Sequence, residues 1–228
     1  MSLNGVVLFM EYENKDICKA CGGMCCKKSG CDYFVSDFKT ITKAEIMAAL
    51  ETGNVSITSA FRFRTLADGK MISRPLLYLR ARNVDRDVID LFSLKKTCSM
   101  LTETGCSYDL EHRPGGGVNL IPDKVKCYPD KNPLQEMLLW EPYQGLLGKM
   151  VYRYTGKNVT TVIREDVERV FYELMTDQTD GVDKRELVDV REGLPDLIKC
   201  FPEEYKNART RSGAYLKVYS KSNNKTTK

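Results

Sequence analysis

The chain has 228 residues, 42% hydrophobic and 29% charged, as expected of a globular protein. No run approaches the roughly 18 apolar residues of a bilayer-spanning helix, and the apolar residues 6–10 lack the basic lead and cleavage site of a signal peptide. The formal net charge of +4 counts thiols as neutral, and metal-bound thiolates would cancel it. Net charge therefore does not predict a polyanionic partner, and we expect a cytoplasmic protein.

Three regions are predicted along the chain. Residues 1–132 form a cysteine-rich, metal-binding α+β region, residues 133–205 form a helical region packed on it as one unit, and residues 206–228 form a basic, partly disordered tail. The predicted fold class is α+β, with a small antiparallel sheet, cysteine-rich metal-binding loops and C-terminal helices packed against them.

The first region contains recognisable helix and strand signals. Thr42 and Glu45 have the spacing of a capping box, and the helix that follows is expected to end at Gly53. From residue 55 the hydrophobic period changes towards two, and Asp68-Gly69 predicts a hairpin turn. Two further strands are predicted at residues 75–82 and 88–94, which together give the small sheet.

After Pro133 the pattern becomes helical, because apolar residues recur at spacings of three and four. Helices are predicted at residues 134–140, 143–154, 162–174 and 185–201. A last strand is predicted at residues 213–219.

The nine cysteines carry the chemistry of the sequence. Five of them fall between Cys18 and Cys31, in a loop-like segment without the large apolar residues of a core. Structural disulfides are rare in a reducing cytosol, and nine is an odd number. We therefore predict metal ligation for these thiols, and a buried structural role for Cys200, which lies in an apolar helical context.

The predicted metal ligands are the eight other cysteines. Cys18 and Cys21 form the Cys-x2-Cys pair that can direct two sulfurs at one ion. Eight thiolates suffice for two four-thiolate zinc sites, or for one iron–sulfur cluster with thiols to spare. Because neighbouring side chains diverge in an extended chain, Cys25 and Cys26 suggest more than one metal. The full set is Cys18, Cys21, Cys25, Cys26, Cys31, Cys98, Cys106 and Cys127.

Two cysteine motifs follow each other along the chain: Cys18-x2-Cys21-Gly-Gly-Met-Cys25-Cys26 and Cys98-x2-Leu101-x3-Gly105-Cys106-Ser-Tyr108-x3-His112-Arg113-Pro114. Through these motifs, residues 18–130 resemble the YkgJ-type CxxCxxCC family of zinc- or iron-chelating domains. The resemblance implies metal chelation without an established biochemical role. The chain has three residues, not two, before its vicinal pair, and Cys127-Tyr128-Pro129 follows the Arg-Pro after twelve residues. The clustered N-terminal cysteines are also remotely similar to those of flagellin lysine methylases, which resemble iron–sulfur proteins.

Two neighbouring features have competing interpretations. His112 is the single histidine and could replace a cysteine as ligand, although Cys106 and Cys127 make that unnecessary. The run Gly115-Gly-Gly117 lacks the strand–loop–Lys-Ser/Thr context of a phosphate-binding loop. We interpret it as a flexible insertion.

The remaining patterns do not predict a catalytic site. One histidine supports no Ser-His-Asp or Cys-His arrangement, and no Gly-x-Gly-x-x-Gly motif follows a strand. Alternating arginines and aromatics are compatible with a nucleic-acid platform but equally with any half-buried sheet; these arginines are Arg62, Arg64, Arg80 and Arg82.

Three functions follow from these observations. The first is a metal-binding protein with closed structural zinc sites. The alternative is an iron–sulfur redox protein or enzyme, and the third is a zinc-knuckle nucleic-acid-binding module that uses the basic tail. The metal ion is the one partner that the sequence predicts; no membrane partner is expected, and a nucleic acid is the least favoured.

Overall fold

The computed structural model describes residues 14–28, 31–123 and 127–213 and has the predicted α+β class. The N-terminal elements are α1 (Lys15–Cys21), α2 (Met24–Lys28), the 3-10 helix η1 (Val35–Asp37), α3 (Lys43–Glu51), β1 (Val55–Thr65) and β2 (Met71–Ala81). The middle elements are β3 (Leu101–Thr102), β4 (Gly105–Cys106), α4 (Gly115–Val118), β5 (Leu120–Ile121) and β6 (Tyr128–Pro129). The C-terminal elements are α5 (Pro133–Leu138), η2 (Glu141–Tyr143), α6 (Gln144–Thr155), α7 (Val159–Met175), α8 (Lys184–Cys200) and α9 (Pro202–Ser212).

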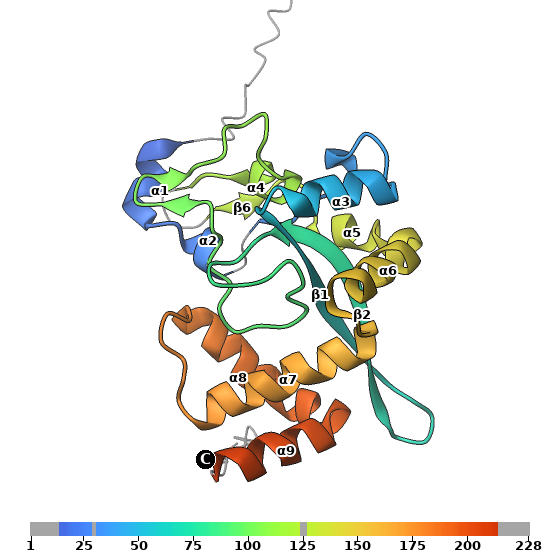
Figure 1. The fold of residues 1–228 in the computed structure, drawn as a ribbon. Helices are drawn as coiled ribbons and strands as arrows, with labels where there is room; N and C mark the ends of the chain where they lie inside the picture. The colour runs from blue at the N-terminus through green and yellow to red at the C-terminus, as the bar shows by residue number, and fades with distance from the viewer. Residues whose placement is uncertain (1–13, 29–30, 124–126, 214–228) are drawn as a thin grey trace, which may run out of the picture.

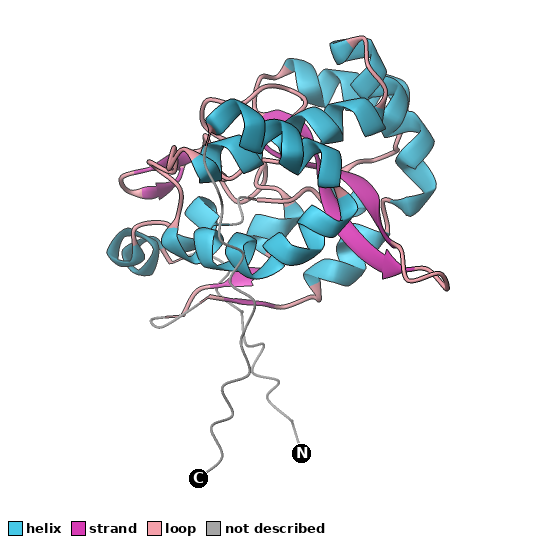
Figure 2. Ribbon diagram, turned by 90° about the horizontal axis from the view of Figure 1, so that it is seen from below, coloured by secondary structure: helices cyan, strands magenta, loops and turns pink. Residues whose placement is uncertain are grey.

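A long β-hairpin runs through the centre of the molecule (Figure 1). Helices α7, α8 and α9 lie together on one side of it. Helices α3, α5 and α6 lie on the other side, towards the end away from the hairpin loop. The short elements α1, α2, α4 and β3–β6 gather beside the end of the hairpin that is opposite its loop. Figure 2 shows the hairpin loop projecting beyond the helices.

The predicted hairpin is confirmed. β1 and β2 pair antiparallel from Val55 opposite Ala81 to Thr65 opposite Met71. Asp68-Gly69 forms the turn, where Gly69 has a φ of 81° and the Asp68 carboxylate accepts a hydrogen bond from the Lys70 amide at 2.9 Å. β2 therefore begins four residues before the predicted position, at Met71.

The strand predicted at residues 88–94 is wrong. This segment makes one parallel bridge, between Ile57 and Ile89, and then leaves β1. The carboxylate of Asp166 on α7 accepts the backbone amides of Leu91 and Phe92, each at 3.1 Å. A side chain from another region thus takes the Phe92 amide, which is the next donor that would face β1 in this register.

The predicted helices are confirmed, with shifted ends. Thr42 caps α3 by accepting the Glu45 amide at 3.3 Å, whereas the Glu45 carboxylate accepts from the Thr40 hydroxyl, at 2.7 Å. α5, α6, α7 and α8 correspond to the four helices predicted after Pro133. A further helix, α9, packs on α7 and continues to Ser212, within the segment predicted as tail. The strand predicted at 213–219 lies outside the described residues, apart from Gly213.

The main core lies between the hairpin and the C-terminal helices. Trp140 is fully buried, and its indole Nε1 donates to the Tyr33 carbonyl at 2.9 Å. The side-chain amide of Gln144 occupies the outer edge of β2, accepting from the Leu77 amide at 2.8 Å and donating to its carbonyl at 2.7 Å. This amide satisfies the edge strand as a neighbouring strand would.

The interpretation of Gly115-Gly-Gly117 as a flexible insertion is wrong. These glycines form the helical turn of α4, packed against residues 31–34. A Cβ on Gly116 would lie 2.7 Å from the Asp32 carbonyl oxygen, and one on Gly117 would lie 2.4 Å from the Cys31 sulfur. Glycine is required here because the backbone of residues 115–117 lies so close to residues 31–34.

Across the described residues, every helix is too short or too polar to cross a bilayer.

This packing predicts a strong effect of one methyl group. Gly116→Ala should lower the free energy of unfolding by about 1–3 kcal/mol, because a backbone contact cannot relax as a flexible side chain can. Gly145→Ala on α6 is the matched control, since a Cβ there meets nothing within 4 Å. Urea unfolding of both variants tests the prediction, and equal stabilities would contradict it.

Candidate metal centre

The first cysteine block runs from Cys18 to Cys31, and the second from Cys98 to Cys127. Four of the five cysteines of the first block lie on two short helices, where a loop was predicted. The Asn14 side chain caps α1 by accepting the Ile17 amide at 3.0 Å, and α1 ends at Gly22 in the left-handed region, with a φ of 64°. Cys18 and Cys21 lie one helical turn apart and so share a face of α1. Gly23, with a φ of 73°, completes the turn into α2, which carries the vicinal pair.

Backbone hydrogen bonds join the two cysteine blocks. The Ala81 amide at the end of β2 donates to the Cys31 carbonyl at 2.8 Å, and the Ser99 amide donates to the Arg82 carbonyl, also at 2.8 Å. The Cys98 amide donates to the Cys26 carbonyl at 2.9 Å. Ala81, the last residue of β2, and Arg82, which follows it, therefore lie between the segments of Cys31 and Cys98 and hold both in place.

All eight predicted ligands line one cavity of about 60 Å³. α1 and α2 contribute four cysteines, β4 contributes Cys106, and irregular segments contribute the other three. The cavity therefore brings together side chains as distant in sequence as Cys18 and Cys127. The full set is Cys18, Cys21, Cys25, Cys26, Cys31, Cys98, Cys106 and Cys127.

The vicinal pair does not diverge as an extended chain would. On α2 the Cys25 and Cys26 sulfurs are 3.9 Å apart. Two sulfurs of a tetrahedral zinc site with bonds of about 2.3 Å are separated by about 3.8 Å. The geometric reason for assigning this pair to two different ions is therefore removed.

The thiols disfavour one another's ionised form. Burial, followed by the charges of neighbouring thiols, raises the pKa of Cys18, and it raises that of Cys31 well above the usual value. Burial likewise raises the pKa of Cys98. The hydrogen bond within the vicinal pair lowers the pKa of Cys25 to about 6 and raises that of Cys26. Several thiolates can coexist in this cavity if a cation compensates their charge.

His112 and Cys200, which are not among the eight predicted ligands, lie apart from the cavity. The His112 side chain is 70% exposed, and its Nδ1 lies 2.8 Å from the Asp109 carboxylate. It is absent from the cavity lining, which argues against its use as a ligand in this arrangement. Cys200 ends α8 and is partly buried against the main core, as its apolar context predicted.

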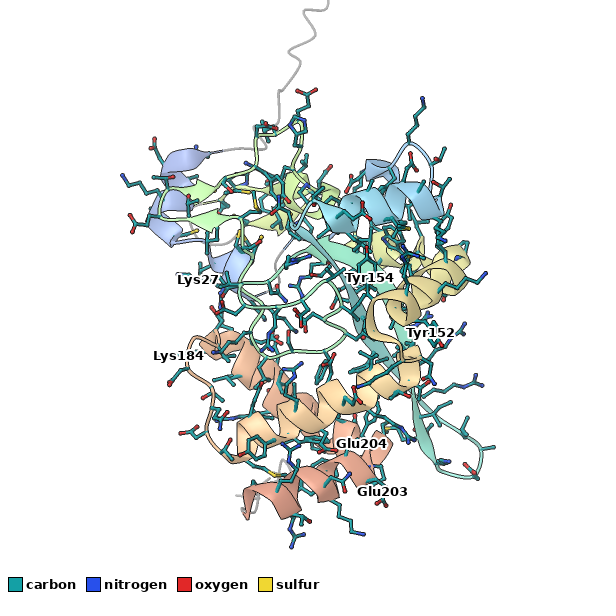
Figure 3. The ribbon with its side chains drawn as sticks, viewed as in Figure 1. Lys27, Tyr152, Tyr154, Lys184, Glu203 and Glu204 are labelled. Carbon is teal, nitrogen blue, oxygen red and sulfur yellow. The ribbon has the colours of Figure 1, made fainter. Side chains whose placement is uncertain are left out.

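Two arginines beside the thiols were not predicted as site residues. Arg113 lines the cavity, and its charge opposes the rise in the pKa of Cys18 and Cys31. Arg185 on α8 donates to the Met24 carbonyl on α2 at 2.8 Å, and its charge favours the Cys25 thiolate. Lys27 of α2 and Lys184 of α8 mark these two helices in Figure 3. Arg113 lies within the motif that begins at Cys98, whereas no local sequence signal links Arg185 to the cysteines.

A second cavity, of about 410 Å³, adjoins the first. Cys21, Cys25 and Cys127 line both cavities. Asp32 also lines the larger one; its Oδ1 makes no hydrogen bond among the described residues and lies 3.8 Å from the Arg80 Nε. The cysteine cluster therefore has one side that faces a space large enough for a small molecule.

The donor chemistry of the cavity fits a thiophilic metal, because eight thiols surround one small space. In the described part of the chain, no three Cys, His, Asp or Glu side chains already converge on one point as metal ligands do. Ligation would therefore require the sulfurs to turn towards a common centre.

The position of Arg185 has a measurable pH signature. Asp183 caps α8 and accepts from the Arg185 guanidinium at 2.8 Å, an interaction that lowers the pKa of Asp183 to about 2. Because this value is below the usual value of about 3.9, the charged carboxylate stabilises the fold above about pH 4, and that contribution is lost as the pH falls towards 2. Asp183→Asn keeps a good N-cap but removes the charge. Urea unfolding should show the advantage of the wild type over this variant shrinking across this window; parallel pH profiles would contradict the assignment.

No protein-family model, curated protein or solved structure matches the chain. The resemblance to the YkgJ-type family therefore stays a prediction from the cysteine pattern. The functional argument depends on the residues around the two cavities.

Proposed function

We propose that the protein binds metal through the eight cysteines of the small cavity, as a zinc protein in the first instance. The observation that carries the proposal is the convergence of both cysteine blocks on one cavity. Burial and neighbouring thiols raise the pKa of Cys18 and Cys31, so without a cation these groups stay as neutral thiols. Metal binding would release the thiol protons, and the cation would balance the charge of the resulting thiolates and fix the short helices α1 and α2.

The proposed ligands divide between the two blocks. Cys25 and Cys26, with sulfurs 3.9 Å apart, are suited to one tetrahedral ion. Zinc would cross-link the cysteine segments, and this role is structural and requires no catalytic step. A reducing cytoplasm, which we propose as the location, would keep the thiols available.

The larger cavity favours a second candidate, an iron–sulfur redox protein or enzyme. A structural zinc site is normally closed. Here Cys21, Cys25 and Cys127 also line the neighbouring cavity of about 410 Å³, so one side of the group of cysteines faces open space. A cluster held by four of the cysteines would therefore be reachable by a small molecule. Asp32 would contribute a polar group to that space.

Metal analysis of anaerobically purified protein distinguishes these candidates. The zinc proposal predicts a colourless protein with stoichiometric zinc. The second candidate predicts iron and acid-labile sulfide, with absorption that bleaches with dithionite. Purified protein with neither zinc nor iron, which also failed to take up either metal under reducing conditions, would contradict the proposed function.

Single substitutions locate the metal. Cys98→Ser should lower metal content, because Cys98 lies in the cavity and its amide is bonded to the other block. Cys200→Ser is the matched control and should keep full content, since Cys200 lies apart from the cavity. Equal loss in both variants would show that general instability, and not ligation, determines metal content.

The vicinal pair tests the number of sites. If Cys25 and Cys26 hold the same ion, Cys25→Ser and Cys26→Ser should lower metal stoichiometry to the same extent. The double variant Cys25→Ser/Cys26→Ser should then lose no more metal than either single variant. A further loss in the double variant, measured by elemental analysis, would restore the two-ion interpretation.

A further inference from the structure

The loop end of the β1–β2 hairpin extends beyond the body of the molecule (Figures 1 and 2). The strand edges nearer the body are covered. The Ile57 amide donates to the Val88 carbonyl at 2.8 Å on the outer side of β1, and Gln144 covers Leu77 on the outer side of β2. Past Ser59 and Leu77 no strand continues this covering among the described residues, so the end of β1 and the start of β2 form an arm with uncovered outer edges. At its base, the Phe61 ring packs on Phe92, with ring centroids 4.9 Å apart.

The outer edge of β1 is open along this arm. Because Ile57 points its backbone groups away from β2, the alternation of the strand points those of Phe61, Phe63 and Thr65 the same way. Within the described ranges, the amides and carbonyls of these three residues make no hydrogen bond. An incoming extended chain could pair with them and continue the contact that residues 88–90 begin.

The outer edge of β2 is less suited to such pairing. Pro75 lies opposite Phe61 in the ladder and has no amide hydrogen to donate. Proline on an edge strand is a common obstacle to the addition of another strand. The β1 edge is therefore the favoured side.

The charge of the arm indicates the chemistry of the partner. Residues 61–75 contain four basic residues and one acid, Asp68, which is bonded within its own turn. Arg62 pairs with Glu141 at 2.5 Å, and no ion pair of the other three is found in the described part of the chain. The four are Arg62, Arg64, Lys70 and Arg74. A second copy of the chain would bring like charges together, so the arm opposes self-association.

We propose that the β1 edge of this arm binds an acidic, extended segment of a partner protein by adding it as a third strand. Alternate side chains of that segment would face Arg62 and Arg64 on one side of the sheet and Phe63 on the other. The ligand class is therefore a peptide in which acidic and apolar residues alternate. A nucleic acid fits less well, because it would leave the open backbone groups unpaired and find one exposed aromatic ring, Phe63, which is 39% exposed.

The test uses full-length protein and an acetylated, amidated octapeptide of alternating valine and glutamate. Saturable binding in isothermal titration is expected, with none for the valine–lysine peptide. Phe63→Pro should weaken binding about tenfold, since it removes one outward amide donor. Ser73→Pro is the matched control on the opposite strand, because Ser73 pairs with Phe63 and its amide also points outward. This control should bind as the wild type does.

Arg64→Gln keeps the hairpin backbone unchanged and should weaken binding and reduce its dependence on salt. Circular dichroism of each variant confirms that the hairpin variants are folded. The proposal is overturned if the wild type does not bind the acidic peptide, if both proline variants lose binding equally, or if single-stranded oligothymidylate binds in place of the peptide. Metal content has no part in these outcomes, so they are independent of the proposed metal centre.

Discussion

The structure depends on a short backbone ladder at the end of β2. On one side the Ala81 amide donates to the Cys31 carbonyl, and on the other the Arg82 carbonyl accepts from the Ser99 amide. Because β1 pairs with β2 along its length and α6 and α8 pack on β2, this ladder fixes two cysteine segments that lie far apart in the chain. The helices α1 and α2 are then held against them through the bond from the Cys98 amide to the Cys26 carbonyl.

Electrostatics couples the ionisation of these thiols to the binding of a cation. Burial and neighbouring thiols raise the pKa of Cys18, Cys31 and Cys98, so these groups resist ionisation on their own. Arg113 offsets part of this effect, as does Arg185 at Cys25. A divalent ion or cluster, once bound, would balance the charge of the thiolates that ligate it. The proposed role in metal binding depends on the convergence of the eight thiols on one cavity.

Local signals predicted much of the fold. The Thr42 cap, the Asp68-Gly69 turn and the apolar stripes after Pro133 act over a few residues, and the structure contains each of them. The failures involve distant partners. The amides of residues 91 and 92 are taken by Asp166, and the glycines of α4 are required by the backbone of residues 31–34. The cysteine set was predictable from spacing, whereas the larger cavity and Arg185 required the packing of α8 against α2.

X-ray absorption at the metal edge tests the central claim most directly. The claim is that thiolates from both cysteine blocks share one metal centre in the small cavity. The predicted result is a first shell of sulfur alone, with metal–sulfur distances of about 2.3 Å, and a lower sulfur number after Cys98→Ser but not after Cys200→Ser. A first shell made mainly of oxygen or nitrogen, or one unchanged by Cys98→Ser, would contradict it.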